Sequence, residues 1–265
     1  MSAKVTSETG VIYIATGEKY FQEACLNASR SKLHAEDLPF AILTDVNPSS
    51  SSELVFDIHI KLEKCSYSYR DKILGLSINV FKNFLFLDSD ACLISPPYEL
   101  ITALDHFDIC ACEAPVKHPP GWSSPSVPSF FPEYNSGVIL CKSSVKVGQF
   151  FQAWLSIYDS LLSSHNQAWD QATFRHCLWT YIKAESLKFY SLPVEYNLRT
   201  TKPWTASRGM PVYVVHGRYP NNEFSTFTSY LNSNIDCFRT WAHWISLYPN
   251  TLIRPKYDKT NYELF

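Results

Sequence analysis

The chain has no excess of charge of either sign. Its 265 residues include 23 Lys and Arg against 25 Asp and Glu, which gives a formal net charge of −2. Proteins that bind nucleic acid or anionic membranes through their overall charge carry a basic excess. The composition therefore argues against a nucleic-acid partner, although a local cluster of cations is still enough to bind a small phosphorylated ligand.

Long hydrophobic runs are also missing. No stretch approaches the roughly 20 apolar residues that a membrane span needs. The opening segment MSAKVTSETG is polar, and the apolar run VIYIA that follows is too short for the hydrophobic region of a secretory signal. We therefore expect no membrane span and a cytoplasmic location.

Cysteine pairs at metal-binding spacing are the third absence. The eight cysteines are scattered along the chain, and no CxxC motif occurs among them. Structural zinc sites are built from closely spaced ligand pairs, so a zinc site is not expected. In a cytosolic protein, scattered cysteines indicate reduced and mostly buried thiols.

Short apolar runs alternate with segments of helical periodicity along most of the chain. Near-continuous apolar strands alternating with helices are typical of a mainly parallel sheet that is buried on both faces. We predict one α/β domain over 1–265, with helices on both faces of the sheet, a nucleotide-binding part at about 11–112 and an acceptor part at about 113–265. The expected strands are 11–15, 39–44, 56–60, 84–87, 108–112, 136–141 and 212–215, and the expected helices are 20–33, 71–81, 148–162 and 169–182. Residues 118–132 contain five prolines and are expected to form an exposed loop that borders a site.

An acidic pair follows the most apolar of these strands. Asp88 and Asp90 come directly after the run FLFL. Residues two apart in an extended chain point to the same side, so the two carboxylates converge and repel each other. A hard divalent cation such as Mg²⁺ or Mn²⁺ resolves this repulsion. Aspartates are also common where strands end, so the pair alone leaves a structural turn open as well.

Six short motifs occur in a characteristic order around this pair. They are VIYIATG, YRDKIL, FLFLDSDACLISP, EYNSGVILCKSS, WDQATF and VVHG, and they extend from about residue 11 to 219. In this order they resemble the motifs of the glycosyltransferases of the A-type (GT-A) fold, specifically the retaining family that includes bacterial galactosyltransferases and glycogenin. The resemblance implies a GT-A fold with a Rossmann-like central sheet.

The resemblance also implies a role for individual residues. The cation, Mn²⁺ or Mg²⁺, would be held by Asp88, Asp90 and His216. The nucleoside would be cradled by Ala15, Thr16, Gly17 and Tyr20, with Thr44 and Asp45 at the base or ribose. The ribose and diphosphate would be reached by Arg70 and Lys72, and the donor site would also include Ser89, Ser136, Gly217 and Arg218. Asn135 and Asp170 would hydrogen-bond hydroxyls of the donor sugar, and Gln171 would lie near its anomeric carbon, which makes Asp170 and Gln171 the predicted catalytic pair.

Several of these residues have plain structural alternatives. A single histidine at a strand end, such as His216, is often a satisfied structural residue. Asn135 and Asp170 are suitable helix or turn caps. Arg218 is either a diphosphate clamp, in place of the family's lysine, or a surface charge.

The expected function is transfer of a sugar from a nucleotide-diphosphate sugar, with UDP favoured, to a hydroxyl of a glycan or other acceptor. The Asp-Gln pair favours retention of configuration. Inversion would require a general base, for which Asp170, Glu113 and Glu133 are the candidates. The alternatives are a phosphatase of the haloacid-dehalogenase type and a sugar-nucleotide-binding protein without catalysis. In that phosphatase fold the acidic pair follows the first strand, whereas three strands are predicted before Asp88 here.

Overall fold

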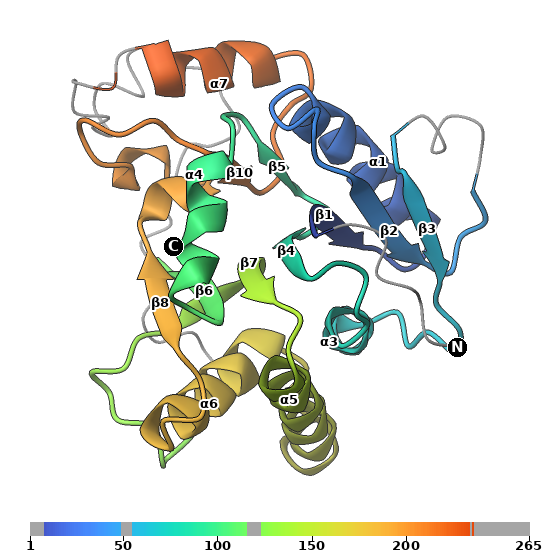
Figure 1. Cartoon of the computed structure of the whole chain (residues 1–265), viewed down its shortest axis with the longest axis vertical. Helices are drawn as coiled ribbons and strands as arrows, with labels where there is room; N and C mark the ends of the chain where they lie inside the picture. Colours follow the sequence, from blue (N-terminus) through green and yellow to red (C-terminus); the bar gives the residue numbers. More distant parts are fainter. Residues whose placement is uncertain (1–7, 49–54, 116–122, 234, 236–265) are drawn as a thin grey trace, which may run out of the picture.

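A computed structural model describes residues 8–48, 55–115, 123–233 and 235 (Figure 1). A seven-stranded sheet with the order β3-β2-β1-β4-β7-β6-β8 forms its centre. All strands of this sheet run in one direction except β7, which is antiparallel to both β4 and β6. The strands are β1 (Thr9–Ile14), β2 (Phe40–Thr44), β3 (Ile58–Lys61), β4 (Asn83–Leu87), β6 (Ile109–Glu113), β7 (Tyr134–Lys142) and β8 (Phe189–Leu192).

Helices cover both faces of the sheet because the central strands are apolar on both sides. In β1, Val11 and Tyr13 belong to a core that includes Phe21 and Ala24 of α1 (Glu18–Lys32). Ile12 and Ile14 of the same strand face the opposite core. That core includes side chains of α3 (Tyr69–Leu76), α5 (Val145–His165) and α6 (Asp170–Lys183). The two cores lie on opposite sides of the sheet, as the alternation of side chains along a strand requires.

A second, three-stranded sheet has the order β5-β10-β9. Its strands are β5 (Ala91–Leu93), β9 (Leu198–Arg199) and β10 (Val214–His216). His216 pairs with Ala91, which follows the acidic pair directly. The remaining elements are α4 (Tyr98–Ile101), α7 (Phe224–Ser233) and the 3₁₀-helices Thr102–Asp105, Val194–Tyr196 and Pro203–Thr205.

The predicted α/β fold with a mainly parallel sheet is confirmed, with differences in detail. The helix expected at 71–81 is shorter, because Ser68 caps its start and the chain leaves the helix at Ser77. The strand expected at 212–215 is displaced to Val214–His216 and belongs to the second sheet, antiparallel to β5. The sequence reading missed β5, β8 and β9, which are two to four residues long. Seven cysteines lie in the described residues and all are free, five of them buried, as predicted.

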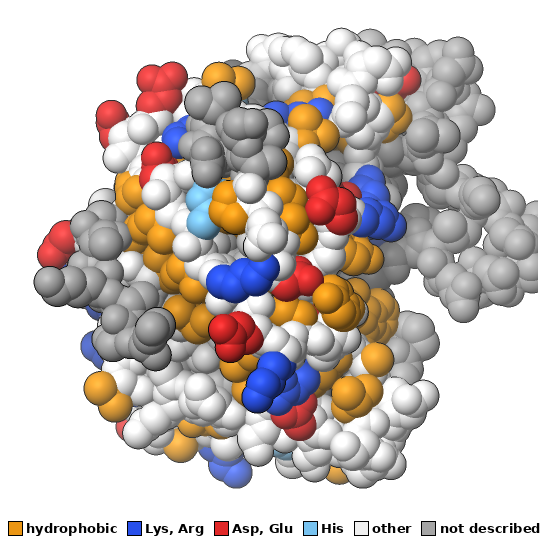
Figure 2. Space-filling view, turned by 90° about the vertical axis from the view of Figure 1, so that its right-hand side faces the viewer, with side chains coloured by type: hydrophobic (Ala, Val, Ile, Leu, Met, Phe, Trp, Pro, Cys, Tyr) orange, Lys and Arg blue, Asp and Glu red, His pale blue; other side chains and the backbone are white. Residues whose placement is uncertain are grey.

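The surface combines charges of both signs on the face drawn in Figure 2. Basic and acidic side chains are interspersed there among apolar ones. Within the described part of the chain, no helix combines the length and apolar character that a membrane span requires.

Two glycines offer a matched test of the packing. A Cβ on Gly10 of β1 would lie 2.4 Å from Cε2 of the buried Phe81 ring, whereas a Cβ on Gly148 of α5 would meet nothing within 4 Å. Overpacking a core typically costs about 1–3 kcal/mol, and Gly→Ala inside a helix gains up to about 1 kcal/mol. In urea unfolding, we expect Gly10→Ala to lower the free energy of unfolding by about 1–3 kcal/mol. We expect Gly148→Ala to raise it by up to about 1 kcal/mol. Equal effects of the two variants would contradict the packing of Phe81 against β1.

Candidate functional site

Two aspartates and a histidine converge where β4 and β10 end. Asp88 follows β4, Asp90 precedes β5, and His216 is the last residue of β10. Nε2 of His216 lies 3.2 Å from Oδ1 of Asp90 and 3.7 Å from Oδ2 of Asp88. One ligand atom from each residue lies within 4.8 Å of the others. Backbone hydrogen bonds from Asp88 N to Gly137 O (2.8 Å) and from Gly217 N to Asp90 O (2.9 Å) hold the three segments together.

The imidazole of His216 is oriented by a hydrogen bond on its far side. Nδ1 lies 2.8 Å from Oδ1 of Asn197, and because this amide oxygen can only accept, Nδ1 donates its proton. Nε2 is then the nitrogen that faces the two carboxylates. Burial lowers the pKa of His216, which favours the neutral imidazole that binds metals.

The residues fit a divalent cation. Two carboxylates and one imidazole are a suitable donor set for Mn²⁺ or Mg²⁺. Gly137 of β7 makes room for them, since a Cβ at this position would lie 2.3 Å from Cε1 of His216 and 2.4 Å from Oδ2 of Asp88.

The two carboxylates of the pair differ in their tendency to ionise. Burial raises the pKa of Asp88, although Lys72 and His216 oppose this effect. Burial alone would also raise the pKa of Asp90, but the interaction with His216 and the charges of Arg199 and Arg218 together outweigh it, so the pKa of Asp90 is lowered. This divergence is the response expected of two close carboxylates, and a cation between them would favour the ionised form of both.

A buried ammonium group lies next to the pair. Nζ of Lys72 is 2.5 Å from Oδ2 of Asp170, 3.4 Å from Oδ1 of Asp88 and 3.1 Å from Oγ of Ser136. Ser136 also donates to Oδ2 of Asp170 at 2.7 Å. The structure thus brings these four predicted residues together. Arg70, predicted beside Lys72, instead makes a two-point ion pair with Asp159 of α5, at 2.8 and 2.9 Å.

The second member of the Asp-Gln pair belongs to another hydrogen-bond chain. Nδ2 of Asn135 lies 3.4 Å from Oε1 of Gln171, and Oδ1 of Asn135 accepts from Gly137 N at 3.0 Å. Gln171 also acts on the buried carboxylate of Glu133, whose raised pKa it partly opposes. Oε1 of Glu133 is 3.6 Å from Nε of Arg175. Gln171 therefore lies between Asn135 and Glu133.

The residues predicted at the nucleoside gather where β1 and β2 end side by side. Gly17 has a φ of 80°, and its N–H donates to Oδ1 of Asp45 at 2.8 Å. Oδ2 of Asp45 accepts from the Tyr67 hydroxyl at 2.9 Å, so both its oxygens are engaged. Thr16 donates to Asp71 at 3.0 Å. The other members of this group are Ala15 and Thr44, which are buried, and Tyr20, which is exposed.

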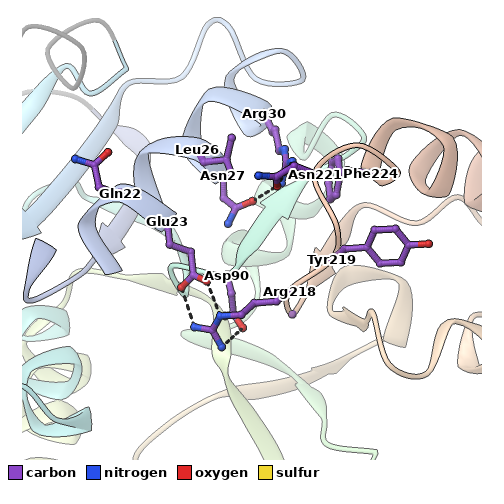
Figure 3. A pocket seen from close by; sticks show the side chains of 11 residues that line it. Gln22, Glu23, Leu26, Asn27, Arg30, Asp90, Arg218, Tyr219, Asn221 and Phe224 are labelled. Atoms are coloured by element: carbon purple, nitrogen blue, oxygen red, sulfur yellow. Dashed lines mark hydrogen bonds and ion pairs between the residues drawn. The ribbon is translucent and has the colours of Figure 1, made fainter. Parts of the chain in front are cut away.

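A cavity of about 310 Å³ opens between α1 and the loop after β10 (Figure 3). Two side chains that line it form a fork-like ion pair: Nε of Arg218 is 2.7 Å from Oε1 of Glu23, and Nη2 is 2.9 Å from Oε2. Ser89 donates to Oε2 of Glu23 at 2.8 Å. Nη1 of Arg218 lies 3.9 Å from Oδ2 of Asp90, so the guanidinium reaches the acidic pair. Gly217 and Asp90 line the same cavity.

The structure adds two residues that sequence reasoning missed. Asn197 and Glu23 touch predicted site residues, His216 and Arg218 respectively. Neither carries a signal in the sequence, because Glu23 is one of several charges on a surface helix and Asn197 lies outside the six motifs.

Solved structures share this architecture. The galactosyltransferase LgtC, in complex with donor and acceptor sugar analogs, matches with a TM-score of 0.57 and 14% identity over 84% of this chain and 96% of that chain. An active-site mutant of LgtC matches with a TM-score of 0.55 and 12% identity over 93% and 98%. GlyE of Streptococcus pneumoniae TIGR4 matches with a TM-score of 0.54 and 15% identity over 79% and 55%. No curated protein sequence matches the chain.

The family model of the nucleotide-diphospho-sugar transferases matches residues 76–223, more than half of the chain. The chain belongs to this family. The prediction of a GT-A glycosyltransferase is thereby confirmed, and the alternative of a phosphatase is rejected. The matched region of this transferase includes the acidic pair, Asn135, the Asp-Gln pair and His216.

Glu133 makes the stability of the transferase depend on pH. Burial raises its pKa from 4.5 to about 7, although Arg175 and Gln171 oppose the shift. Between these values the native state keeps a proton that the unfolded state releases, so the free energy of unfolding falls as pH rises. Glu133→Gln cannot titrate. We expect urea unfolding at about pH 5 and about pH 8 to show a relative gain in stability of this variant at the higher pH. Parallel pH profiles of variant and wild type would contradict a buried, proton-retaining Glu133.

Proposed function

We propose that this transferase moves a sugar from a nucleoside-diphosphate sugar, with UDP favoured, to a hydroxyl of a glycan or other acceptor. A divalent cation, Mn²⁺ or Mg²⁺, would be held by Asp88, Asp90 and His216. The observation that carries this proposal is the convergence of these three side chains around Gly137, where a Cβ would collide with two of them. The part before about residue 113 would bind the nucleotide, and the part after it would bind the acceptor.

Charge on the leaving group is the main chemical problem of such a transfer. When bound, the cation supplies electrostatic stabilisation of the diphosphate. Arg218 would add a second positive charge, since its guanidinium lies 3.9 Å from Asp90 and is held by both oxygens of Glu23. A guanidinium fork suits phosphate oxygens, which supports the clamp role over that of a free surface charge.

The donor sugar would lie against Asp170 and Asn135. Lys72 and Ser136 both contact Oδ2 of Asp170, and we assign Oδ1 to a sugar hydroxyl. These contacts fix the carboxylate before a donor arrives, which reduces the reorganisation needed on binding.

Retention of configuration is the outcome that the surroundings of the carboxylates support. An inverting enzyme needs a carboxylate free to accept the proton of the acceptor. Asp170 is paired with Lys72, and Glu133 is buried against Arg175 and Gln171. Glu113, the third candidate, is the last and exposed residue of β6. Because two of the three candidate bases are engaged in this way, we assign the acceptor proton to a diphosphate oxygen on the leaving-group face, with Gln171 beside the anomeric carbon.

The first test is calorimetric titration of UDP and GDP, with and without Mn²⁺. We expect one nucleotide to bind in a Mn²⁺-dependent manner and Asp90→Ala to weaken this binding by at least about tenfold, or 1.4 kcal/mol. Asp57→Ala is a matched control, because Asp57 directly precedes β3, on the far side of β2 from β1, and forms a partly exposed pair with Lys32. Absence of binding of either nucleotide at about 1 mM would overturn the proposal.

A donor screen then separates catalysis from binding. Similarity to a galactosyltransferase makes UDP-galactose the first donor to test, with release of UDP as the readout. Mn²⁺-dependent binding without UDP release from any sugar donor or acceptor would favour the non-catalytic sugar-nucleotide-binding alternative.

A further inference from the structure

A continuous chain of side-chain amides connects the proposed cation site with the proposed donor-sugar site. It extends from His216 through Asn197 and Asn135 to Gln171, with donor–acceptor distances of 2.8, 3.0 and 3.4 Å. Its members come from β10, the segment before β9, β7 and α6. Elements far apart in the sequence thus meet through polar groups in the interior.

We propose that Asn197 is a positioning residue that couples the cation-binding geometry of His216 to the orientation of Asn135 and Gln171. This inference rests on the proposed function, because it assigns a task to residues of that site. Asn197 itself would touch neither the cation nor the donor.

The oxygen and the nitrogen of the buried Asn197 amide contact the two sides of the site. Asn197 and His216 are 4% and 3% exposed, so water does not substitute readily for their contacts. Oδ1 of Asn197 accepts from Nδ1 of His216, and Nδ2 of Asn197 donates to Oδ1 of Asn135. An amide oxygen cannot donate and an amide nitrogen cannot accept, so both contacts are satisfied in only one orientation of the group.

This orientation dictates the chemistry at each end of the chain. At one end, Nδ1 of His216 carries the proton and Nε2 is turned to Asp88 and Asp90. At the other end, Oδ1 of Asn135 is filled by Asn197 and by the N–H of Gly137, which directs the Nδ2 group of Asn135 toward Gln171. Ligating histidines are commonly held this way, and loss of the outer partner typically weakens metal binding about 10–100-fold.

Two substitutions separate the two ends. Asn197→Asp keeps an acceptor for His216 but cannot donate to Asn135, and it places an oxygen against an oxygen. Asn197→Ala removes both contacts. Asn166→Asp is a matched control, because this substitution also replaces an amide with a carboxylate, but at an exposed position at the end of α5.

The first readout is Mn²⁺ affinity without nucleotide, measured from the EPR signal of free Mn²⁺. We expect Asn197→Ala to weaken Mn²⁺ binding by about 10–100-fold and Asn197→Asp to bind as tightly as wild type or more tightly. The second readout is the rate of UDP release from the donor that the screen identifies. It should fall by about 100-fold in Asn197→Asp, because a side chain misplaced by about 1 Å has an effect of that size.

A third readout does not depend on cation binding or activity. The ¹⁵N chemical shifts of the His216 imidazole should report a protonated Nδ1 in the cation-free wild type and in Asn197→Asp, and should change in Asn197→Ala. A transferase that fails the nucleotide test but shows these shifts would refute the proposed function and leave the orienting contact standing.

Three results would overturn the inference. They are a wild-type His216 protonated on Nε2 alone, Mn²⁺ affinity unchanged in Asn197→Ala, and UDP release at the wild-type rate in Asn197→Asp. Urea unfolding of each variant checks that the fold is retained, and the conservative Asn197→Asp keeps the test open if Asn197→Ala does not fold.

Discussion

The ammonium group of Lys72 is the interaction on which the rest of the site depends. It connects α3 with Asp88 after β4 and with Asp170 at the start of α6, at 3.4 and 2.5 Å. Burial alone would lower the pKa of Lys72, but the two carboxylates outweigh it and hold the pKa above its usual value. A buried charge without partners is strongly destabilising, so the three elements are constrained to dock in the arrangement that satisfies it. That arrangement also places Asp88 beside the proposed cation position.

The small second sheet positions the histidine of the proposed cation site. β10 runs antiparallel to β5 and places His216 opposite Ala91, directly after the acidic pair. Gly137 of β7 leaves room for the imidazole and for Asp88. The proposed cation site therefore lies at a junction between the two sheets, with a third contact to the loop that carries Arg218. Glu23 of α1 holds this arginine near Asp90, so the surface helix that follows β1 also shapes the site.

Much of the fold, and the acidic pair of the site, could be predicted from the sequence because the relevant signals are local. Apolar runs such as FLFL predict buried strands, and an acidic pair after such a run predicts a polar site at the sheet edge. The short strands β5 and β9 were not predictable, since three and two residues carry no periodicity. Arg70 and Lys72 look equivalent in sequence. They differ only because residues two apart on a helix face different ways, so that Arg70 meets Asp159 and Lys72 enters the interior. The contacts of Asn197 and Glu23 likewise depend on tertiary structure alone.

The proposed cation site is tested most directly by pulsed electron–nuclear double resonance of Mn²⁺ bound to the transferase together with UDP. We expect a ³¹P coupling from the diphosphate and a nitrogen coupling from His216 on the same Mn²⁺ centre. The nitrogen coupling should disappear in His216→Ala, and the population of the centre should fall in Asp88→Asn. A Mn²⁺ centre with ³¹P coupling but no nitrogen coupling, unchanged in both variants, would show that the nucleotide carries its cation elsewhere and would contradict the assignment of Asp88, Asp90 and His216.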